Sequence, residues 1–334
     1  MEQTPTDPAQ SIRGRTFAVR NPKRQLLLIT GSDSLAWLQG QVSNDVRRLE
    51  RGEASIQACV LNATGHLLAD VMLFSLPPAS PVLSALGMQQ GAIVADLPAM
   101  QISKVRENWE RFIVMENVIL RDAGEMMRRI SIHGPGAGEA LPEALAALCT
   151  IYPSNSAAEG GSELLFPVSA QPNIEELLLA AGIVFASAEA AELIRIEEGR
   201  PEFGPDMDES VIALEARLGP THISLSKGCY VGQEIIARID ARGHTNRGLV
   251  GLVLEPDAVI NAGERIFAGG EEATRETGRV TSAAGFSPTV GAPIALGYVR
   301  HEHGEPGSTV WIVRDGSRSP AQIVSLPFTS LASG

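Results

Sequence analysis

Cysteine is scarce in this sequence, and its spacing excludes two common structural roles. The 334 residues contain three cysteines, Cys59, Cys149 and Cys229. An odd number of thiols about 80 to 90 residues apart fits neither a disulfide framework nor a C-x-x-C metal knuckle. A reducing compartment is the simpler interpretation.

The sequence also lacks long apolar runs and a positive net charge. No stretch approaches the roughly 18 apolar residues that a bilayer-spanning helix needs, and the start, MEQTPTDPAQ, does not have the pattern of a signal peptide. We therefore expect a cytoplasmic protein. The net charge of −12 opposes binding to a phosphate backbone over the whole surface, so contact with nucleic acid would need a local basic patch.

Length and composition predict a folded protein of more than one domain. Single cores stop growing near about 250 residues, so a chain of 334 residues is expected to divide. Apolar residues make up 44% of the chain and charged residues 20%, as in ordinary globular proteins. Predicted strands and helices mix without strict alternation, which favours an α+β fold over a doubly wound sheet.

Local patterns predict the elements before residue 200. The expected strands are 25–30, 54–61, 67–75, 92–96, 111–115 and 129–133, and the expected helices are 98–109, 138–149, 174–181 and 188–198, after a first helix around Leu35, Leu38 and Val42. Asn62–Gly65 is expected to form the tight turn of a hairpin, because Asn and Gly adopt positive φ readily. Residues 152–161, rich in Ser, Ala, Asn and Gly, are expected to form a loop.

The sequence pattern changes after Gly243. Short β-like runs follow at 249–254, 277–281, 295–299 and 309–313, punctuated by Gly and Pro. This spacing predicts a small barrel or sandwich. We therefore expect two interleaved α+β subdomains in residues 1–240 and a separate C-terminal β-barrel in residues 245–334.

One segment, SKGCYVGQE at 226–234, has a composition unlike that of a core. Cys229 lies between two glycines, beside Lys227 and Tyr230, in a turn that backbone or a partner can approach closely. Lys227 is expected to lower the pKa of the thiol, and a helix starting near Gly232 adds its positive end. A reactive or metal-coordinating sulfur is one interpretation, and an inert turn cysteine is the other.

The string KGCYVGQE at 227–234 resembles the signature of the YgfZ family, folate-binding relatives of the glycine-cleavage T-protein. Further similar segments are GSDSLAWLQGQVSNDV at 31–46, LNATGHLLAD at 61–70, RIEEGRPEFGPDM at 195–207 and ETGRVTSAAGFSPTVGAPIALGYVR at 276–300. The resemblance implies a T-protein-like ring of three domains around a central folate pocket, with mixed sheet and helix domains binding the folate and a small C-terminal barrel.

The same resemblance implies a function. The first hypothesis is a tetrahydrofolate-binding accessory protein for iron-sulfur cluster assembly or repair, which supports tRNA modification indirectly and is not itself an enzyme. Iron-sulfur proteins or assembly factors are then its partners. The second hypothesis is a folate-dependent aminomethyltransferase. The third is direct tRNA contact through the basic residues Arg238, Arg242, His244 and Arg247, which could equally be a solvated loop.

Reduced folate presents N–H donors on a flat pterin and an anionic glutamate tail, so its site needs a carboxylate, an apolar slot and a cation. By resemblance, Glu163 is the candidate pterin acceptor and Glu159 its alternative, and Arg195 and Tyr230 complete the folate-binding set. The competing interpretation makes the glutamates solvated loop residues and Arg195 an exposed helix arginine, paired with Glu192 or Glu198.

Catalysis is where this sequence departs from the T-protein, which carries two adjacent aspartates after its N-x-x-G-G turn. Here the pair reads Ala69-Asp70. Asp70 could still polarise a proton shared with the folate, or it could simply lie on the polar face of a strand. The candidate catalytic residues are therefore Asp70, Cys229 and Lys227.

Two other motifs point to weaker sites. HGPGAG at 133–138 resembles a phosphate loop, but no Gly-Lys-Ser or Gly-Lys-Thr follows it. His301 and His303 have metal-ligand spacing without a third ligand, which is typical of a solvated loop. We therefore predict neither a nucleotide nor a metal.

Overall fold

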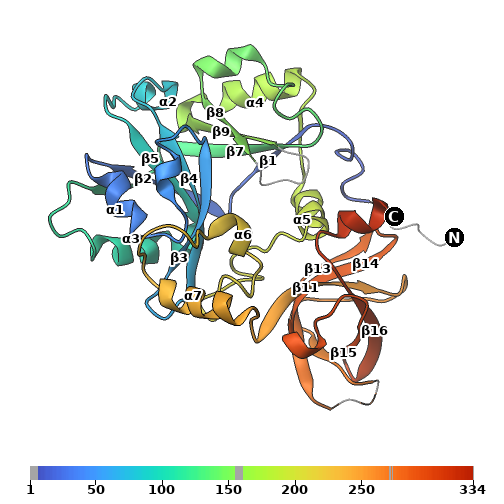
Figure 1. Cartoon of the computed structure of the whole chain (residues 1–334). Coiled ribbons are helices and arrows are strands. Elements are labelled where there is room, and N and C mark those ends of the chain that lie inside the picture. Colours follow the sequence, from blue (N-terminus) through green and yellow to red (C-terminus); the bar gives the residue numbers. More distant parts are fainter. Residues whose placement is uncertain (1–6, 155–160, 271, 273, 334) are drawn as a thin grey trace. The chain divides into compact units, whose positions relative to one another are not determined.

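The computed structural model describes residues 7–154, 161–270, 272 and 274–333 (Figure 1). The chain divides into two compact units. We call Ile12–Ala186 with Gly219–Ile235 the sheet unit. The barrel unit comprises Ser187–Leu218 and Ile236–Gly334, with the described part of Met1–Ser11. No helix in the described ranges has both the length and the apolar character needed to cross a bilayer.

The sheet unit contains two five-stranded sheets. The first sheet has the order β3 (Ser55–Leu61), β4 (Leu67–Leu76), β5 (Ala92–Pro98), β2 (Arg24–Thr30) and β6 (Ile119–Asp122). The second has the order β10 (Val184–Phe185), β1 (Phe17–Arg20), β7 (Met127–His133), β9 (Gly161–Pro167) and β8 (Thr150–Ser154). The helices of this unit are α1 (Ser34–Gln39), α2 (Pro81–Ala85), α3 (Ile102–Glu110), α4 (Gln171–Ala180) and α6 (Gly219–His222), while α7 (Gln233–Arg242) crosses the division between the units.

Each strand of these sheets places alternate side chains on opposite faces. In the first sheet, residues such as Leu27, Leu73 and Ala95 pack with α1 and α3 on the outer face. Their neighbours Leu26 and Phe74 belong to a second cluster, which includes Leu165 of β9, Tyr152 of β8 and side chains of α2. The two sheets therefore share an inner layer.

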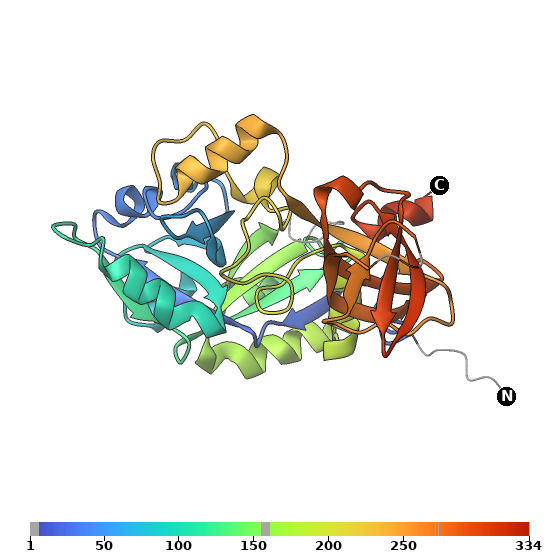
Figure 2. The same cartoon turned by 90° about the horizontal axis from the view of Figure 1, so that it is seen from below.

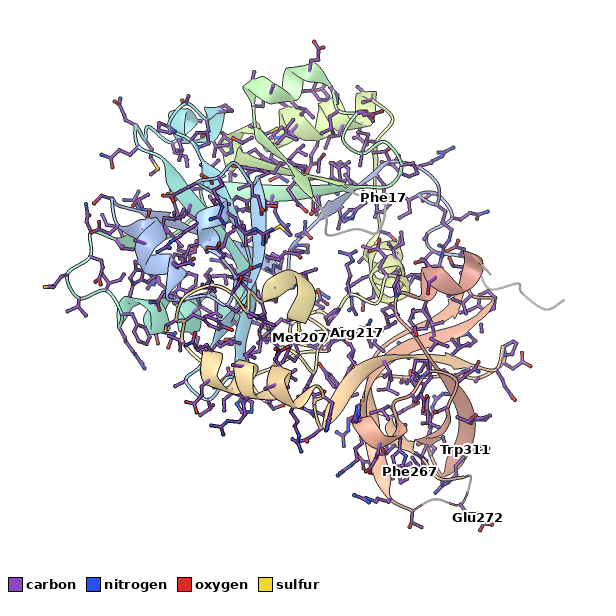
Figure 3. The ribbon with its side chains drawn as sticks, viewed as in Figure 1. Phe17, Met207, Arg217, Phe267, Glu272 and Trp311 are labelled. Carbon is purple, nitrogen blue, oxygen red and sulfur yellow. The ribbon has the colours of Figure 1, made fainter. Side chains whose placement is uncertain are left out.

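The outer face of the second sheet is covered by α4, which lies beneath its strands in Figure 2. Ile174 and Leu178 of this helix pack with Ile132 of β7 and with Leu164 and Phe166 of β9. Phe17 of β1, labelled in Figure 3, stacks on His133 of the neighbouring strand β7 with ring centroids 5.5 Å apart.

The barrel unit contains a closed barrel of six strands. Its order is β11 (Arg247–Leu254), β14 (Ala292–Arg300), β13 (Glu276–Ser287), β12 (Arg265–Phe267), β15 (Thr309–Arg314) and β16 (Ser317–Val324). Inward residues such as Leu252, Ile266 and Ile312 form its core. Phe267 pairs with Trp311 across β12 and β15 (Figure 3), and α5 (Ala188–Glu197) packs against β13. The mixed fold and the C-terminal barrel predicted from the sequence are confirmed.

The hairpin predicted at 54–75 is also confirmed as β3 and β4, and its turn shows why glycine occurs there. Gly65 has a φ of 76°, which a residue with a side chain rarely adopts. Asn62 supports the turn because its side-chain oxygen accepts hydrogen bonds from the amides of Thr64 and His66.

Three local predictions were wrong. Residues 111–115 form a turn after α3 rather than a strand, with Val114 81% and Met115 93% exposed. The helix expected at 138–149 is reduced to a short 3-10 helix, Glu143–Ala147, because Pro142 has no amide hydrogen to continue a longer one. Residues 152–154 of the expected loop belong to strand β8, and residues 155–160 lie outside the described part.

Candidate functional site

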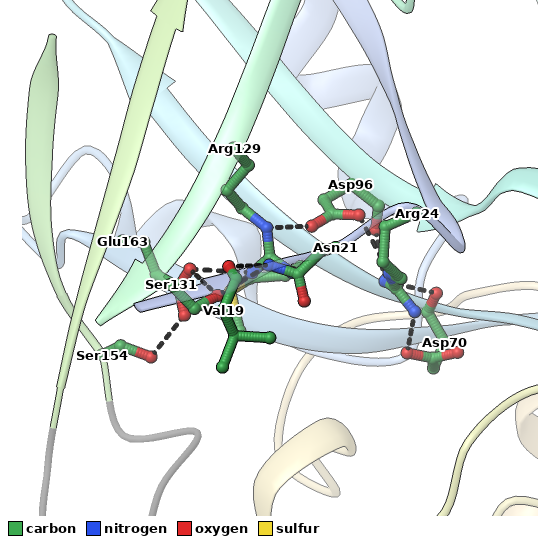
Figure 4. Close-up of polar contacts among 10 residues, drawn as sticks. Val19, Asn21, Arg24, Asp70, Asp96, Arg129, Ser131, Ser154 and Glu163 are labelled. Carbon is green, nitrogen blue, oxygen red and sulfur yellow. Dashed lines mark hydrogen bonds and ion pairs between the residues drawn. The ribbon is translucent and has the colours of Figure 1, made fainter. Parts of the chain in front are cut away.

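A chain of alternating charges crosses the inner layer between the two sheets (Figure 4). Arg24 contacts Asp70 at 2.6 Å and Asp96 at 2.9 Å. Arg129 contacts the other oxygen of Asp96 at 2.5 Å and Glu163 at 2.9 Å. Three carboxylates and two guanidinium groups leave one net negative charge, which suits a ligand edge that donates hydrogen bonds.

Strand periodicity explains why these side chains meet. Arg24 lies on the same face of β2 as Leu26, Asp70 on the same face of β4 as Phe74, and Asp96 on the same face of β5 as Val94. Arg129 and Glu163 lie on the inward faces of β7 and β9 by the same rule. The charged residues thus continue the apolar inner layer at one end.

The Arg24 guanidinium stays charged in this buried chain of charges. Burial opposes the charge of Arg24, but Asp70 and Asp96 raise the pKa of this guanidinium above its ordinary value. Asp96 is fully buried and faces an arginine on each side. Buried charges of this kind persist only when they are paired.

Glu163, the predicted pterin acceptor, is fully buried in β9. Its carboxylate accepts hydrogen bonds from the hydroxyls of Ser131 and Ser154 at 2.7 and 2.8 Å, besides the contact with Arg129. The alternative that Glu163 is a solvated loop residue is wrong, because β9 places it on an inward position between strands β7 and β8. Glu159 lies outside the described residues.

Asp70 is the open end of the chain of charges. Its Oδ2 accepts a hydrogen bond from the Arg24 guanidinium, whereas its buried Oδ1 has no hydrogen-bond partner within the described residues. The side chain is 19% exposed. Ala69, which replaces the other T-protein aspartate, points to the opposite face and packs in the outer core. The surviving carboxylate is therefore the one that faces the inner layer.

The segment 226–234 packs against the β3–β4 hairpin, which carries Asp70. Cys59 lies opposite Asp70 across β3 and β4, and burial together with Asp70 raises the pKa of its thiol. Burial and Cys59 raise the pKa of Tyr230 to about 12. A Cβ on Gly232 would lie 2.6 Å from the carbonyl oxygen of Asn62, so only glycine allows this close approach.

The three cysteines differ in exposure. Cys59 and Cys149 are buried, whereas Cys229 is exposed. Within the described residues, no hydrogen bond or ion pair reaches the sulfur of Cys229. Lys227 is directed elsewhere: burial lowers its pKa to about 8, and its ammonium group donates to the carbonyl oxygens of Gln39, Val42 and Asn44.

Arg195 lies in the barrel unit and is buried, so the interpretation as an exposed helix arginine is wrong. It makes the expected pair with Glu192 at 2.7 Å. It also contacts Asp206 at 2.7 Å and donates to the hydroxyl of Ser282 at 2.8 Å. Its position against β13 explains the burial, because the helix α5 turns this face toward the barrel.

The remaining motifs bring few groups together. His301 stacks on His244 with ring centroids 4.5 Å apart, and the described residues contain no group of three or more side chains placed to hold a metal ion. Residues 133–138 form a turn that no α-helix follows directly. In the predicted basic patch, Arg247 is paired with Glu215 at 3.1 Å.

A cavity of about 410 Å³ opens onto the chain of charges. Arg24, Asp96 and Arg129 contribute to its wall, together with the apolar residues Leu26 and Met127, whereas Asp70 and Glu163 are not among its lining residues. Its volume lies in the range of small-molecule sites, about 300 to 1,000 Å³.

Sequence reasoning missed the residues that connect Asp70 to Glu163. These are Arg24, Asp96 and Arg129, with Ser131 and Ser154 as hydrogen-bond partners. A signal existed in the strand AIVADLP, where an aspartate occupies an inward position of an otherwise apolar strand. A buried strand tolerates such a charge only when a partner compensates it.

Comparison with known proteins agrees with the fold. Residues 247–329 match the family model described as the glycine cleavage T-protein C-terminal barrel domain. The chain is 25% identical over 322 residues to an aminomethyltransferase of Picosynechococcus sp., covering 90% of this chain and 83% of that protein. It is 26% identical over 329 residues to an aminomethyltransferase of Chlorobium luteolum, covering 91% and 85%.

The structure superposes on the crystal structure of the glycine cleavage system aminomethyltransferase T from Bartonella henselae with a TM-score of 0.79. The alignment covers 96% of this chain and 88% of that chain at 20% identity, which establishes a shared fold. Together with the barrel match and the sequence relatives, this likeness supports the T-protein superfamily.

Proposed function

We propose that the sheet unit binds a reduced folate against the chain of charges from Asp70 to Glu163 and uses it for one-carbon transfer of the aminomethyltransferase type. The observation that carries the proposal is the buried Oδ1 of Asp70, which lacks a hydrogen-bond partner within the described residues. A buried acceptor of this kind costs about 1 to 3 kcal/mol unless a donor reaches it. The names of the relatives support the reaction class.

The residues present fit the folate. Its pterin needs a carboxylate and an apolar slot. Asp70 offers the carboxylate and is joined to the cavity wall by Arg24, and that wall includes Leu26 and Met127. Its anionic tail needs a cation, and Arg20 and Arg128 lie in the same wall. Tetrahydrofolate supplies the nitrogen that takes up the one-carbon unit.

The role of Asp70 follows from its two oxygens. Arg24 holds Oδ2 and thereby orients the carboxylate, so that Oδ1 accepts a hydrogen bond from the ligand or holds a proton during transfer. Glu163 acts at a distance, because its oxygens are engaged by Ser131, Ser154 and Arg129. It orients Arg129, which in turn fixes Asp96.

The substitution Asp70→Asn tests this proposal, because it keeps the size of the side chain and removes its charge. The wild-type protein is expected to bind tetrahydrofolate in a calorimetric titration and to form methylene-tetrahydrofolate from an aminomethyl donor, with release of ammonia and of the donor's carrier group. Loss of one such polar group typically costs a factor of about 100 or more in turnover. Asp257→Asn, at an exposed position of the barrel unit, is the control and should change nothing. Transfer at the wild-type rate by Asp70→Asn, or no folate binding by the wild type, rules the proposal out.

The exposed thiol of Cys229 favours a second function. In this function the protein assists iron-sulfur cluster assembly or repair and thereby supports tRNA modification indirectly. It predicts that Cys229→Ala lowers the activity of cluster enzymes in cells while folate binding persists. Cys149→Ala, which removes a buried thiol, is the matched control. If cluster enzymes keep full activity with Cys229→Ala, the thiol has no such role. Wild-type folate binding without aminomethyl transfer would favour this second function over the first.

A further inference from the structure

Two segments about 180 residues apart in sequence lie side by side in the sheet unit. The segment 221–231 runs along the turn that follows α1, and four hydrogen bonds join their backbones and side chains. These bonds are Ser224 N to Ser43 O at 3.0 Å, Val231 N to Gly40 O at 3.2 Å, Ser43 Oγ to His222 O at 2.7 Å and Asn44 Nδ2 to Thr221 O at 3.0 Å. The position of the Cys229 turn therefore depends on the turn after α1.

Lys227 adds the strongest contacts between the two segments. Its Nζ donates to the carbonyl oxygens of Gln39, Val42 and Asn44 at 2.6, 2.7 and 2.7 Å. An ammonium group has three hydrogens, so these contacts use all of them. The acceptors lie at and just beyond the end of α1, where helix carbonyls have no partner within the helix.

This arrangement directs the next residues of the turn. Cys229 is exposed, whereas Tyr230 is half-buried with its ring centroid 5.2 Å from the ammonium group of Lys227. Tyr230 also lies near Cys59, the cross-strand partner of Asp70. Consecutive side chains thus point in different directions, one into solvent and one toward the hairpin that carries Asp70.

We propose that Lys227 is a positioning residue: by clamping three carbonyl oxygens after α1, it holds Tyr230 against the Asp70 hairpin and Cys229 in solvent. Because its three hydrogens go to backbone acceptors, Lys227 has none left to donate to the thiol. The proposal rests on the proposed function only for its folate measurement. Its hydrogen-exchange and thiol measurements are independent of folate.

The test compares Lys227→Met with the wild type, because methionine keeps the length of the side chain and loses its donors. Amide hydrogen exchange of residues 224–233 is expected to speed up by a factor of about 10. This factor corresponds to a decrease of about 1.4 kcal/mol in the free energy of local opening. Tetrahydrofolate affinity should fall in parallel. Lys104→Met, at an exposed position of α3, should leave both measurements unchanged.

The thiol distinguishes positioning from activation. Iodoacetamide should alkylate Cys229 in the native protein while the buried Cys59 and Cys149 stay unmodified. In Lys227→Met, the midpoint of the pH profile for alkylation should stay where it is in the wild type. Loss of an activating cation would instead raise the midpoint by about one unit or more. A raised midpoint, or unchanged exchange of residues 224–233, overturns the proposal.

Lys227→Gln provides a second variant should Lys227→Met not fold. Its shorter neutral amide keeps two donors, so exchange should lie between the wild type and Lys227→Met, again with an unchanged alkylation midpoint. If the wild type does not bind tetrahydrofolate, the proposed function fails. Exchange and alkylation still decide the role of Lys227 in that case.

Discussion

The sheet unit and the barrel unit each bury a network of charges, but the two networks differ at their ends. In the barrel unit, Asp206 accepts from the hydroxyls of Thr281 and Ser282 on Oδ1 and from Arg195 and the amide of Glu202 on Oδ2. Both oxygens are used. In the sheet unit, the chain ends at Asp70, whose Oδ1 has no partner within the described residues.

A buried ion pair alone is therefore weak evidence of a functional site. Closed networks are costly to build and serve the fold, since removing either partner leaves an uncompensated charge. A buried acceptor without a hydrogen-bond donor at the end of such a network carries a desolvation penalty, which a bound ligand can remove by donating a hydrogen bond. By this criterion we propose Asp70 rather than Arg195 as a ligand-binding residue, since Arg195 joins α5 to the barrel.

The substitution Arg129→Met should break the sheet-unit network most severely. It leaves Asp96 and Glu163 buried without their shared cation, and breaking a buried pair in this way costs about 3 to 5 kcal/mol of unfolding free energy. Urea denaturation measures the loss, and folate affinity should fall with it because Asp96, which holds Arg24, loses its second partner.

The matched control is Arg48→Met, which breaks an exposed pair with Glu53. Exposed pairs contribute at most about 1 kcal/mol, so the midpoint of denaturation should hardly move. Equal losses of unfolding free energy for Arg129→Met and Arg48→Met would show that the buried ion pairs stabilise the fold no more than an exposed pair does.

The substitution Arg195→Met tests the closed network. It should destabilise the barrel unit by a comparable amount, about 3 to 5 kcal/mol, because Asp206 loses its cation. Tetrahydrofolate affinity of the folded protein should stay within a factor of about 2, well under 1 kcal/mol. A large loss of affinity in a stably folded variant would instead place Arg195 in contact with folate, as the family resemblance implies.

The pH dependence of the unfolding free energy is expected to be the smallest effect. It compares a buried cation of the barrel unit, Arg195, with one of the sheet unit, Lys227. Burial opposes the charge of Arg195, but Glu192 and Asp206 raise its pKa above the ordinary value, so it stays charged. Lys227 has a pKa of about 8 in the folded chain, against 10.5 for an ordinary lysine. Between these values the unfolded chain binds more protons, so the unfolding free energy should rise with pH.

This increase is expected to be about 1 kcal/mol between pH 8 and 10.5, after allowance for solvent screening. Urea denaturation across this range measures it as the difference between the wild type and Lys227→Met, which cancels the titration of other groups. A difference that does not change with pH contradicts the lowered pKa of Lys227.

Sequence periodicity was sufficient for much of the fold. The alternation around Asn62–Gly65 predicted the hairpin, and the short runs after Gly243 predicted the barrel, because both depend on neighbours close in the chain. The run at 111–115 misled because Val114 and Met115 face solvent, and the carboxylate of Glu116 accepts hydrogen bonds from the amides of both residues. No local pattern distinguishes an exposed apolar turn from a short strand.

The site was predictable only in part. Asp70 and Glu163 followed from the family resemblance, but no sequence pattern joined them. Their connection runs through Arg24, Asp96 and Arg129, which come from three strands of two different sheets. Strand pairing decides which inward positions meet, and that pairing is a long-range property.

Local sequence patterns were enough to predict most strand and helix periods, the turn glycines and an exposed Cys229 between glycines. Only the tertiary structure decided that Asp70 has an open oxygen, that Glu163 is enclosed by its partners, and that Lys227 binds carbonyls rather than the neighbouring thiol. The physical reason is that local conformation follows from adjacent residues, whereas the partner of a buried charge is set by the packing of distant strands.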